Sequence, residues 1–164
     1  MESNTPMDMN MKLSENFTLG EFLKSQTAER RGISNVPTQD HLDNAFALFE
    51  NVAQPVRDHF GPTIVSSGYR SPELNAAIGG APRSQHQRGE AVDLVIPGVT
   101  TAQVCEWIVN NLTFDQVILE FYDPGDPSSG WTHVSYTRHS ENRGEVLTAT
   151  RVDGTTEYSY GLNY

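Results

Sequence analysis

A histidine and a carboxylate flank a glycine in residues 84–93, and a second histidine stands further along the chain. His86 precedes Gly89 and Asp93 follows it, while His133 lies in the short sequence WTHVS. Two imidazoles and one carboxylate are a sufficient ligand set for a catalytic zinc ion, because three protein ligands leave the fourth tetrahedral position open for water. The sequence therefore predicts that His86, Asp93 and His133 hold one zinc ion per chain.

The neighbouring sequence predicts how these side chains meet. Gly89 permits a turn, and the alternation in residues 91–96 predicts a strand with Asp93 on the same face as the small Ala91. Residues 131–137 predict a second strand that carries His133. If the two strands are neighbours, their ligands can converge on one ion. Oxygen and nitrogen ligands also fit other divalent metals, so zinc is preferred but not the only candidate.

Each of these residues has an ordinary interpretation when it is taken alone. A loop histidine is usually a polar surface residue, and a strand aspartate is often a hydrogen-bonded structural acid. The combination of all three with a well-placed glycine and alanine favours the metal site. His41, His59 and His139 have no such context, so we predict no site role for them.

Composition limits the class of protein. The 164 residues suffice for one domain with a real core, and the net charge of −10 argues against binding to nucleic acid or an anionic membrane. The single cysteine, Cys105, excludes an internal disulfide and lies in an apolar helical pattern, which predicts a core residue. No stretch approaches the ~20 apolar residues of a membrane span. Residues 1–10 lack the apolar centre of a secretory signal, so we expect the protein to be synthesised in the cytoplasm. We also expect it to be a monomer.

Local patterns predict an α+β fold. Residues 1–13 are expected to be a flexible tail, and residues 14–164 a single domain. Predicted helices cover residues 18–32, 38–60, 71–78 and 100–111, with a kink at Pro55. Predicted strands cover residues 63–66, 91–96, 116–121, 131–137, 145–151 and 155–160. Helices followed by mostly hairpin-linked strands favour an antiparallel sheet.

The same residues carry a resemblance to a known family. The pattern Ser84-x-His86-x-x-Gly89-x-Ala91-x-Asp93 resembles the zinc-site motif of D-alanyl-D-alanine carboxypeptidases and dipeptidases of the hedgehog/DD-peptidase fold. Four other segments are similar to segments that flank this motif in the family, at residues 17–22, 67–72, 114–120 and 131–135. The resemblance runs from about residue 16 to about residue 136. It looks most like peptidoglycan-cleaving members encoded by phages or carried by bacterial cell-wall enzymes.

The resemblance implies a hedgehog/DD-peptidase-like fold with helices packed on one side of the sheet. It also implies zinc-dependent hydrolysis of peptide bonds in peptidoglycan stem peptides or cross-links, next to D-alanine. Arg70 would stabilise the reacting carbonyl or bind the substrate's carboxylate, since a guanidinium stays charged and donates in a planar fork. Ser84 would hydrogen-bond the substrate. Trp131 and Tyr69 are candidate substrate contacts, with burial in the core as an equal alternative.

The general base departs from one common family pattern. Many relatives carry Glu or Asp three residues before the last histidine ligand, where this chain has Gly130. Other members of the fold place a glutamate at the end of the preceding strand, which Glu120 matches. We therefore predict Glu120 as general base and acid. Asp123 and Asp126 are alternatives on the loop that follows.

Two other functions stay open. Some relatives keep the zinc and act as non-catalytic binding modules, and the missing carboxylate at position 130 gives this alternative some weight. An L-alanyl-D-glutamate endopeptidase would keep the chemistry and change the bond. In either enzymatic case the protein would act on the cell wall or in the periplasm after release, in the manner of an endolysin, or as part of a phage particle.

Overall fold

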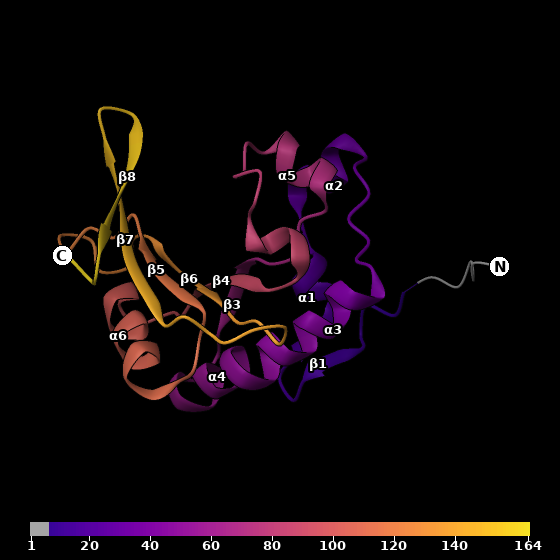
Figure 1. Ribbon diagram of the computed structural model, residues 1–164, viewed down its shortest axis with the longest axis horizontal. Coiled ribbons are helices and arrows are strands. Elements are labelled where there is room, and N and C mark those ends of the chain that lie inside the picture. The colour runs from indigo at the N-terminus through magenta and orange to yellow at the C-terminus, as the bar shows by residue number, and fades with distance from the viewer. Residues whose placement is uncertain (1–6) are drawn as a thin grey trace.

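A mixed sheet of six strands forms the centre of the protein, whose computed structural model describes residues 7–164 (Figure 1). The order across the sheet is β3-β4-β6-β5-β7-β8. Its strands are β3 (Ile64–Ser67), β4 (Ala91–Val95), β5 (Gln116–Glu120), β6 (Trp131–Ser135), β7 (Glu145–Val152) and β8 (Thr155–Tyr160). A separate pair joins β1 (Lys12–Ser14) to β2 (Phe17–Thr18).

Every neighbouring pair in the large sheet is antiparallel except β5 and β7, which are parallel. This pair corrects the expectation of a wholly antiparallel sheet. Strand β6 already lies between β4 and β5, so β7 has no free edge of β6 to pair with. It takes the open edge of β5 instead, and there it runs in the same direction as β5.

Helices precede most of the strands, as the sequence patterns predicted. They are α1 (Leu19–Leu23), α2 (Gln26–Arg31), α3 (Gln39–Leu48), α4 (Gln54–Phe60), α5 (Pro72–Ala77) and α6 (Thr101–Asn111). A π-helical segment (Phe49–Ala53) joins α3 to α4, and a 3₁₀ turn (Gln85–Arg88) precedes β4. No helix among the described residues is both long and apolar enough to cross a membrane.

The first two helices were predicted as one. Thr18 caps α1 in a capping box with Glu21, as expected, but the helix stops at Lys24. Ser25 then caps a second helix by accepting a hydrogen bond from the Ala28 amide. Where a kink was predicted at Pro55, the structure has a π-helical segment just before this proline. Proline lacks the amide hydrogen and its ring crowds the preceding turn, so the helix widens there.

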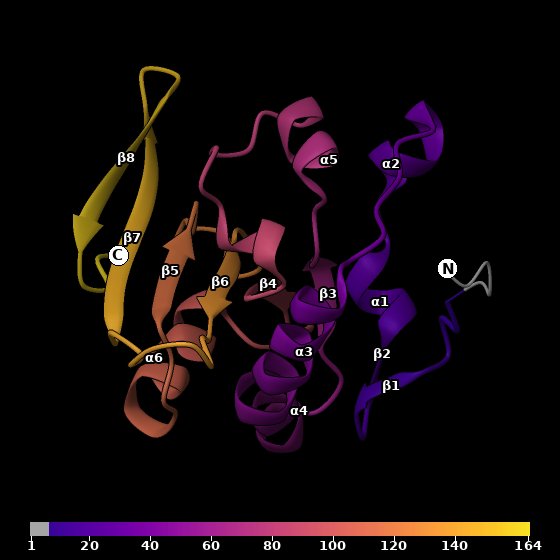
Figure 2. The same ribbon diagram turned by 45° about the vertical axis from the view of Figure 1, so that its right-hand side comes forward.

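Helices α3, α4 and α6 pack against one face of the sheet (Figure 2). Fully buried residues of these helices, such as Leu48 and Ile108, form one core cluster with the strand residues Val92, Leu119 and Val134. Cys105 belongs to this core, as predicted. Since successive strand residues alternate between faces, the opposite face of β4, β5 and β6 is free to carry polar side chains.

The predicted N-terminal tail overlaps regular structure. Residues 1–6 lie outside the described part of the chain. Lys12 and Leu13 belong to β1, and Leu13 is buried in the core. Regular structure therefore starts before the expected domain boundary at residue 14.

Candidate metal centre and cleft

The three predicted ligands meet on the open face of the sheet. Asp93 and His133 are direct partners across β4 and β6, so the two strands are neighbours as the prediction required. His86 lies in the 3₁₀ turn that leads into β4. Asp93 Oδ1 lies 3.3 Å from His86 Nε2 and 3.1 Å from His133 Nδ1, and the three side chains are buried. One nitrogen or oxygen from each residue lies within 4.8 Å of the others.

The hydrogen bond of His86 indicates that a cation fits between the candidate ligand atoms of His86, Asp93 and His133. His86 Nδ1 lies 2.7 Å from the carbonyl oxygen of Gly68, which can only accept, so Nδ1 carries the hydrogen. Nε2 is therefore the nitrogen that faces the Asp93 carboxylate. Either a proton on Nε2 or a metal cation between the two atoms satisfies both of them, and deprotonated Nε2 offers its lone pair to such a cation. The donor set fits a divalent metal, and the Gly68 carbonyl fixes the ring as outer partners of metal ligands do.

Asp93 is held in its ionised form. Burial by itself would raise the pKa of Asp93, but the charges and hydrogen bonds of His86 and His133 outweigh it and hold this pKa well below its usual range. A metal ligand must be deprotonated, so this environment suits the carboxylate to that task.

The turn after His86 depends on glycine, as predicted. Gly89 has φ 73°, in the left-handed region that favours glycine. A Cβ atom at this position would lie 2.3 Å from the His41 carbonyl oxygen. Close packing against α3 therefore fixes where the His86 turn ends and where β4 begins.

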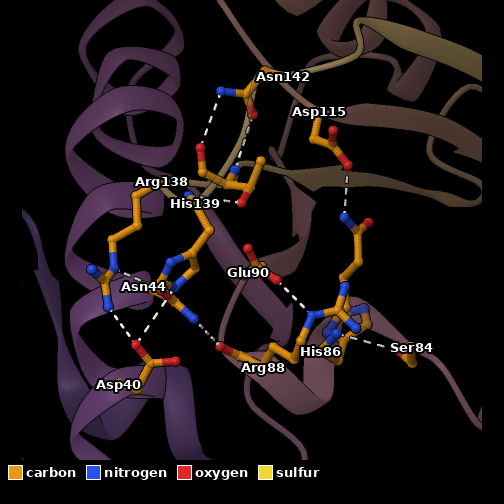
Figure 3. A network of polar contacts seen from close by, with 12 residues as sticks. Asp40, Asn44, Ser84, His86, Arg88, Glu90, Asp115, Arg138, His139 and Asn142 are labelled. Carbon is orange, nitrogen blue, oxygen red and sulfur yellow. Dashed lines mark hydrogen bonds and ion pairs between the residues drawn. The ribbon is translucent and has the colours of Figure 1, made fainter.

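A buried amide ties this turn to the loop that follows β6 (Figure 3). Asn44 of α3 is 2% exposed and donates from Nδ2 to the carbonyl oxygen of Arg88 at 2.9 Å. Its Oδ1 accepts from Arg138 Nε at 2.7 Å and from His139 Nε2 at 3.1 Å. His139, for which no role was predicted, thus takes part in this network. One residue of α3 holds two segments that line the site.

The three predicted ligands open into a cleft of about 960 Å³. Its floor includes Gln116, Ile118 and Glu120, the alternate residues on one face of β5. Ile118 is the direct cross-strand partner of His133. The cleft therefore continues along β5 in both directions from the row of residues that contains the metal ligands.

Glu120 lies at the end of β5, and its side chain lines the same cleft. Burial raises its pKa, and the neighbouring charge of Asp93 adds to this effect, which brings the pKa of Glu120 to about 7. A carboxyl group with such a pKa can both accept and release a proton near neutral pH.

The backbone explains why position 130 has no carboxylate. Gly130 has φ 72°, and a Cβ atom there would lie 2.2 Å from the carbonyl oxygen of Glu120. The two loop alternatives, Asp123 and Asp126, are exposed, do not line the cleft, and accept hydrogen bonds within their own turns. Of the candidates for a general base, only Glu120 lies in the cleft.

Three of the four other predicted site residues also line the cleft, namely Arg70, Ser84 and Trp131. The Arg70 guanidinium lies 3.6 Å from Asp93 Oδ2, and its Nε donates to the Ser67 hydroxyl. The Ser84 hydroxyl caps the 3₁₀ turn by accepting from the His86 amide at 3.2 Å. Their roles toward substrate stay predictions.

Tyr69 lies in the core and not in the cleft. Its side chain is buried in the core against Phe22, and its hydroxyl is 3.2 Å from His41 Nδ1. It is absent from the lining of the cleft. Its predicted contact with substrate therefore has no support from this packing.

Sequence reasoning missed two parts of the cleft wall. Asp115 is buried, accepts from Arg143 Nη2 at 2.9 Å and from Gln85 Nε2 at 2.8 Å, and so fixes both side chains at one end of the cleft. Tyr158 of β8 lines the cleft near Glu120. Tyr158 carries no local signal in the sequence, because only the pairing of β7 with β5 brings the hairpin to this site.

Comparison with known proteins agrees with this geometry. A search of curated proteins found no match. The sequence profile of the family described as Peptidase M15 matches residues 15–135, which is more than half of the chain and includes the three ligands and Glu120. Peptidases of this family depend on zinc, and their fold agrees with the α+β architecture seen here. The predicted resemblance is confirmed: the chain belongs to the Peptidase M15 family of metallopeptidases.

Proposed function

We propose that this protein is a zinc-dependent peptidase that hydrolyses peptide bonds of peptidoglycan stem peptides or cross-links next to D-alanine. The observation that carries the proposal is the buried cluster of His86, Asp93 and His133 in a cleft that also holds a second carboxylate, Glu120. The proposed site of action is the cell wall, reached after release from the cytoplasm or as part of a phage particle, and the proposed active form is a monomer.

The residues of the cleft divide the chemistry between them. A zinc ion held by His86, Asp93 and His133 would polarise the scissile carbonyl and lower the pKa of a water molecule to about 7. The Glu120 carboxylate takes the proton of the attacking water and returns it to the leaving amine, for which a pKa of about 7 is well matched. The Arg70 guanidinium stabilises the negative charge that develops on the carbonyl oxygen, or holds a carboxylate of the substrate.

The position of Glu120 favours an enzyme over a non-catalytic binding module. The binding-module alternative gained weight from the missing carboxylate at position 130. That absence has a steric cause in the contact of Gly130 with the Glu120 backbone, and Glu120 itself lines the cleft. An L-alanyl-D-glutamate endopeptidase would use the same catalytic residues on another bond.

Digestion of purified peptidoglycan tests the proposal. The zinc-loaded protein should release fragments with new termini at D-alanine, identified by mass spectrometry, and a chelator should abolish them. Glu120→Gln should keep its zinc and lose at least about 100-fold in rate, because general base catalysis contributes 10²–10⁴-fold. Fragments that persist after chelation would exclude the metal mechanism. Unchanged activity in Glu120→Gln would remove Glu120 from it, and cleavage between L-alanine and D-glutamate would correct the bond.

A further inference from the structure

The C-terminal hairpin of β7 and β8 lies at one edge of the large sheet (Figure 2). It follows the segment that matches the family, yet it contributes residues to the lining of the cleft. Leu147 of β7 and Tyr158 of β8 both line the cleft. Glu120 is the cross-strand partner of Ala149, which is in turn the partner of Tyr158. Partners in one row of a sheet point to the same face, so Tyr158 and Glu120 share the open face.

An apolar floor joins the metal ligands to this wall. The row that starts at Asp93 and His133 continues through Ile118 and Leu147 to Tyr160 of β8. Tyr158 lies in the next row on the same face, which it shares with Glu120. Three strand steps separate β6 from β8, which is about 14 Å at ~4.8 Å per step. An extended peptide covers that span with about four residues. A peptide held at the metal site can therefore reach Tyr158 across the floor.

Tyr158 has the properties of a contact residue rather than a core residue. Tyr158 is 60% exposed, so most of its ring is accessible to a ligand in the cleft. Partial burial, and then the charge of Glu120, raise the pKa of Tyr158, so its hydroxyl stays protonated and lies near that carboxylate. A tyrosine in such a place offers an apolar face for packing and a hydroxyl for hydrogen bonding.

We propose that Tyr158 is a specificity-determining residue that makes the enzyme select its substrates by peptide length. It contacts the part of a peptide that extends from the metal site over Ile118 and Leu147, so the enzyme prefers peptides of about four residues or more to dipeptides. This inference rests on the proposed peptidase function and adds to it a residue outside the family-matched segment.

The test compares substrates of different length with the same scissile bond. A D-alanyl-D-alanine dipeptide and a stem pentapeptide ending in it are offered to the zinc-loaded wild type, Tyr158→Ala, Tyr158→Phe and Tyr164→Ala. Tyr164 is the matched control, since it is 59% exposed, close to the 60% of Tyr158, and does not line the cleft. We expect Tyr158→Ala to lower kcat/KM about tenfold for the pentapeptide only, mainly through KM, and Tyr158→Phe to keep most of the rate.

Equal losses for both substrates, or equal losses in the Tyr158 and Tyr164 alanine variants, would overturn the proposal. If the wild type cleaves neither peptide, the proposed peptidase function fails. The role of Tyr158 is then tested separately, by measuring how tightly the pentapeptide binds. Calorimetry of the pentapeptide with the zinc-loaded proteins should give a Kd about tenfold weaker for Tyr158→Ala. An unchanged Kd would overturn the role of Tyr158.

Discussion

Two of the acidic residues that line the cleft, Asp93 and Glu120, have pKa values shifted in opposite directions. Interactions with His86 and His133 lower the pKa of Asp93, whereas burial and the charge of Asp93 raise the pKa of Glu120. Such divergent environments are how one site assigns different tasks to the same functional group. Asp93 is suited to hold a cation, and Glu120 is suited to carry a proton.

The raised pKa of Glu120 predicts a pH-dependent loss of folding stability in the metal-free protein. The folded-state pKa is about 7 against an ordinary value of 4.5, so the folded state binds the proton more tightly than the unfolded state. The free energy of unfolding therefore falls as pH rises from 4.5 to 7, and the whole cost is present above pH 7. Glu120→Gln should be more stable than wild type at pH 8, by up to about 3 kcal/mol. Urea titrations at pH 8 and pH 4 measure this, and a difference that is the same at both pH values would contradict it.

The elements that hold the site meet through short backbone contacts and one buried amide. Asn44 connects α3 to the His86 turn and to the loop after β6. Gly130 connects the loop before β6 to the end of β5. Each contact lets a rigid element set the position of a segment that lines the cleft.

Replacement of Asn44 by leucine should destabilise the fold by about 2–3 kcal/mol, because it leaves buried donors and acceptors without partners. Asn51 is the control: it is exposed and bonds only to the Ala47 carbonyl, so Asn51→Leu should change stability by no more than about 0.5 kcal/mol. Thermal or urea unfolding of both variants compares the two costs. Similar losses of stability in Asn44→Leu and Asn51→Leu would mean that the hydrogen bonds of Asn44 add nothing to the stability of the fold.

Replacement of Gly130 by alanine should cost more than the same change at Gly154. Both glycines have positive φ, but only at Gly130 would the Cβ atom meet backbone, whereas nothing lies within 4 Å at Gly154. We expect backbone strain of about 1 kcal/mol at both sites, and a further 1–3 kcal/mol or so at Gly130 from the collision. Unfolding free energies of the two variants check this, and equal losses would show that the β5–β6 loop adapts freely.

The sequence predicted the elements that have strong local signals. Capping residues and helical periodicity located α3 and α6, and alternation located β4, β5 and β6. Local patterns do not specify pairing, because an alternating strand can take any partner. The parallel pairing of β7 with β5 was therefore missed. The break between α1 and α2 was missed as well, although Ser25, which caps α2, is a local signal for it.

The residues of the site could likewise be predicted only where the signal is local in the sequence. His86 and Asp93 stand close together in the sequence around a glycine, so their proximity in the fold could be predicted. The Gly68 carbonyl behind His86, the ion pair of Asp115 with Arg143, and Tyr158 all depend on contacts between distant segments. Such contacts leave no trace in the spacing of residues.

At the scale of the whole molecule, the net charge of −10 opposes the proposed substrate. A cell wall rich in carboxylates repels an acidic protein over the Debye length, which is about 10 Å at 0.1 M salt. Recognition must then come from the cleft itself, where Arg70, Arg83 and Arg143 are found.

Salt should therefore raise the rate on intact walls. Between about 10 and 150 mM salt we expect a several-fold increase in the release of wall fragments, because screening removes the repulsion. The rate on a short uncharged peptide should change little over this range. A rate on walls that falls with salt would indicate attraction through a basic surface, contrary to this account.

The most direct measurement is a crystal structure of the zinc-soaked protein with anomalous data on both sides of the zinc absorption edge, collected for the wild type and for His133→Ala. We predict one strong anomalous peak per chain in the wild type, bonded to His86, Asp93 and His133 at about 2.0–2.2 Å, and its loss or marked weakening in the variant. A peak bonded to other residues, or no peak in protein with intact ligands, would contradict the central claim.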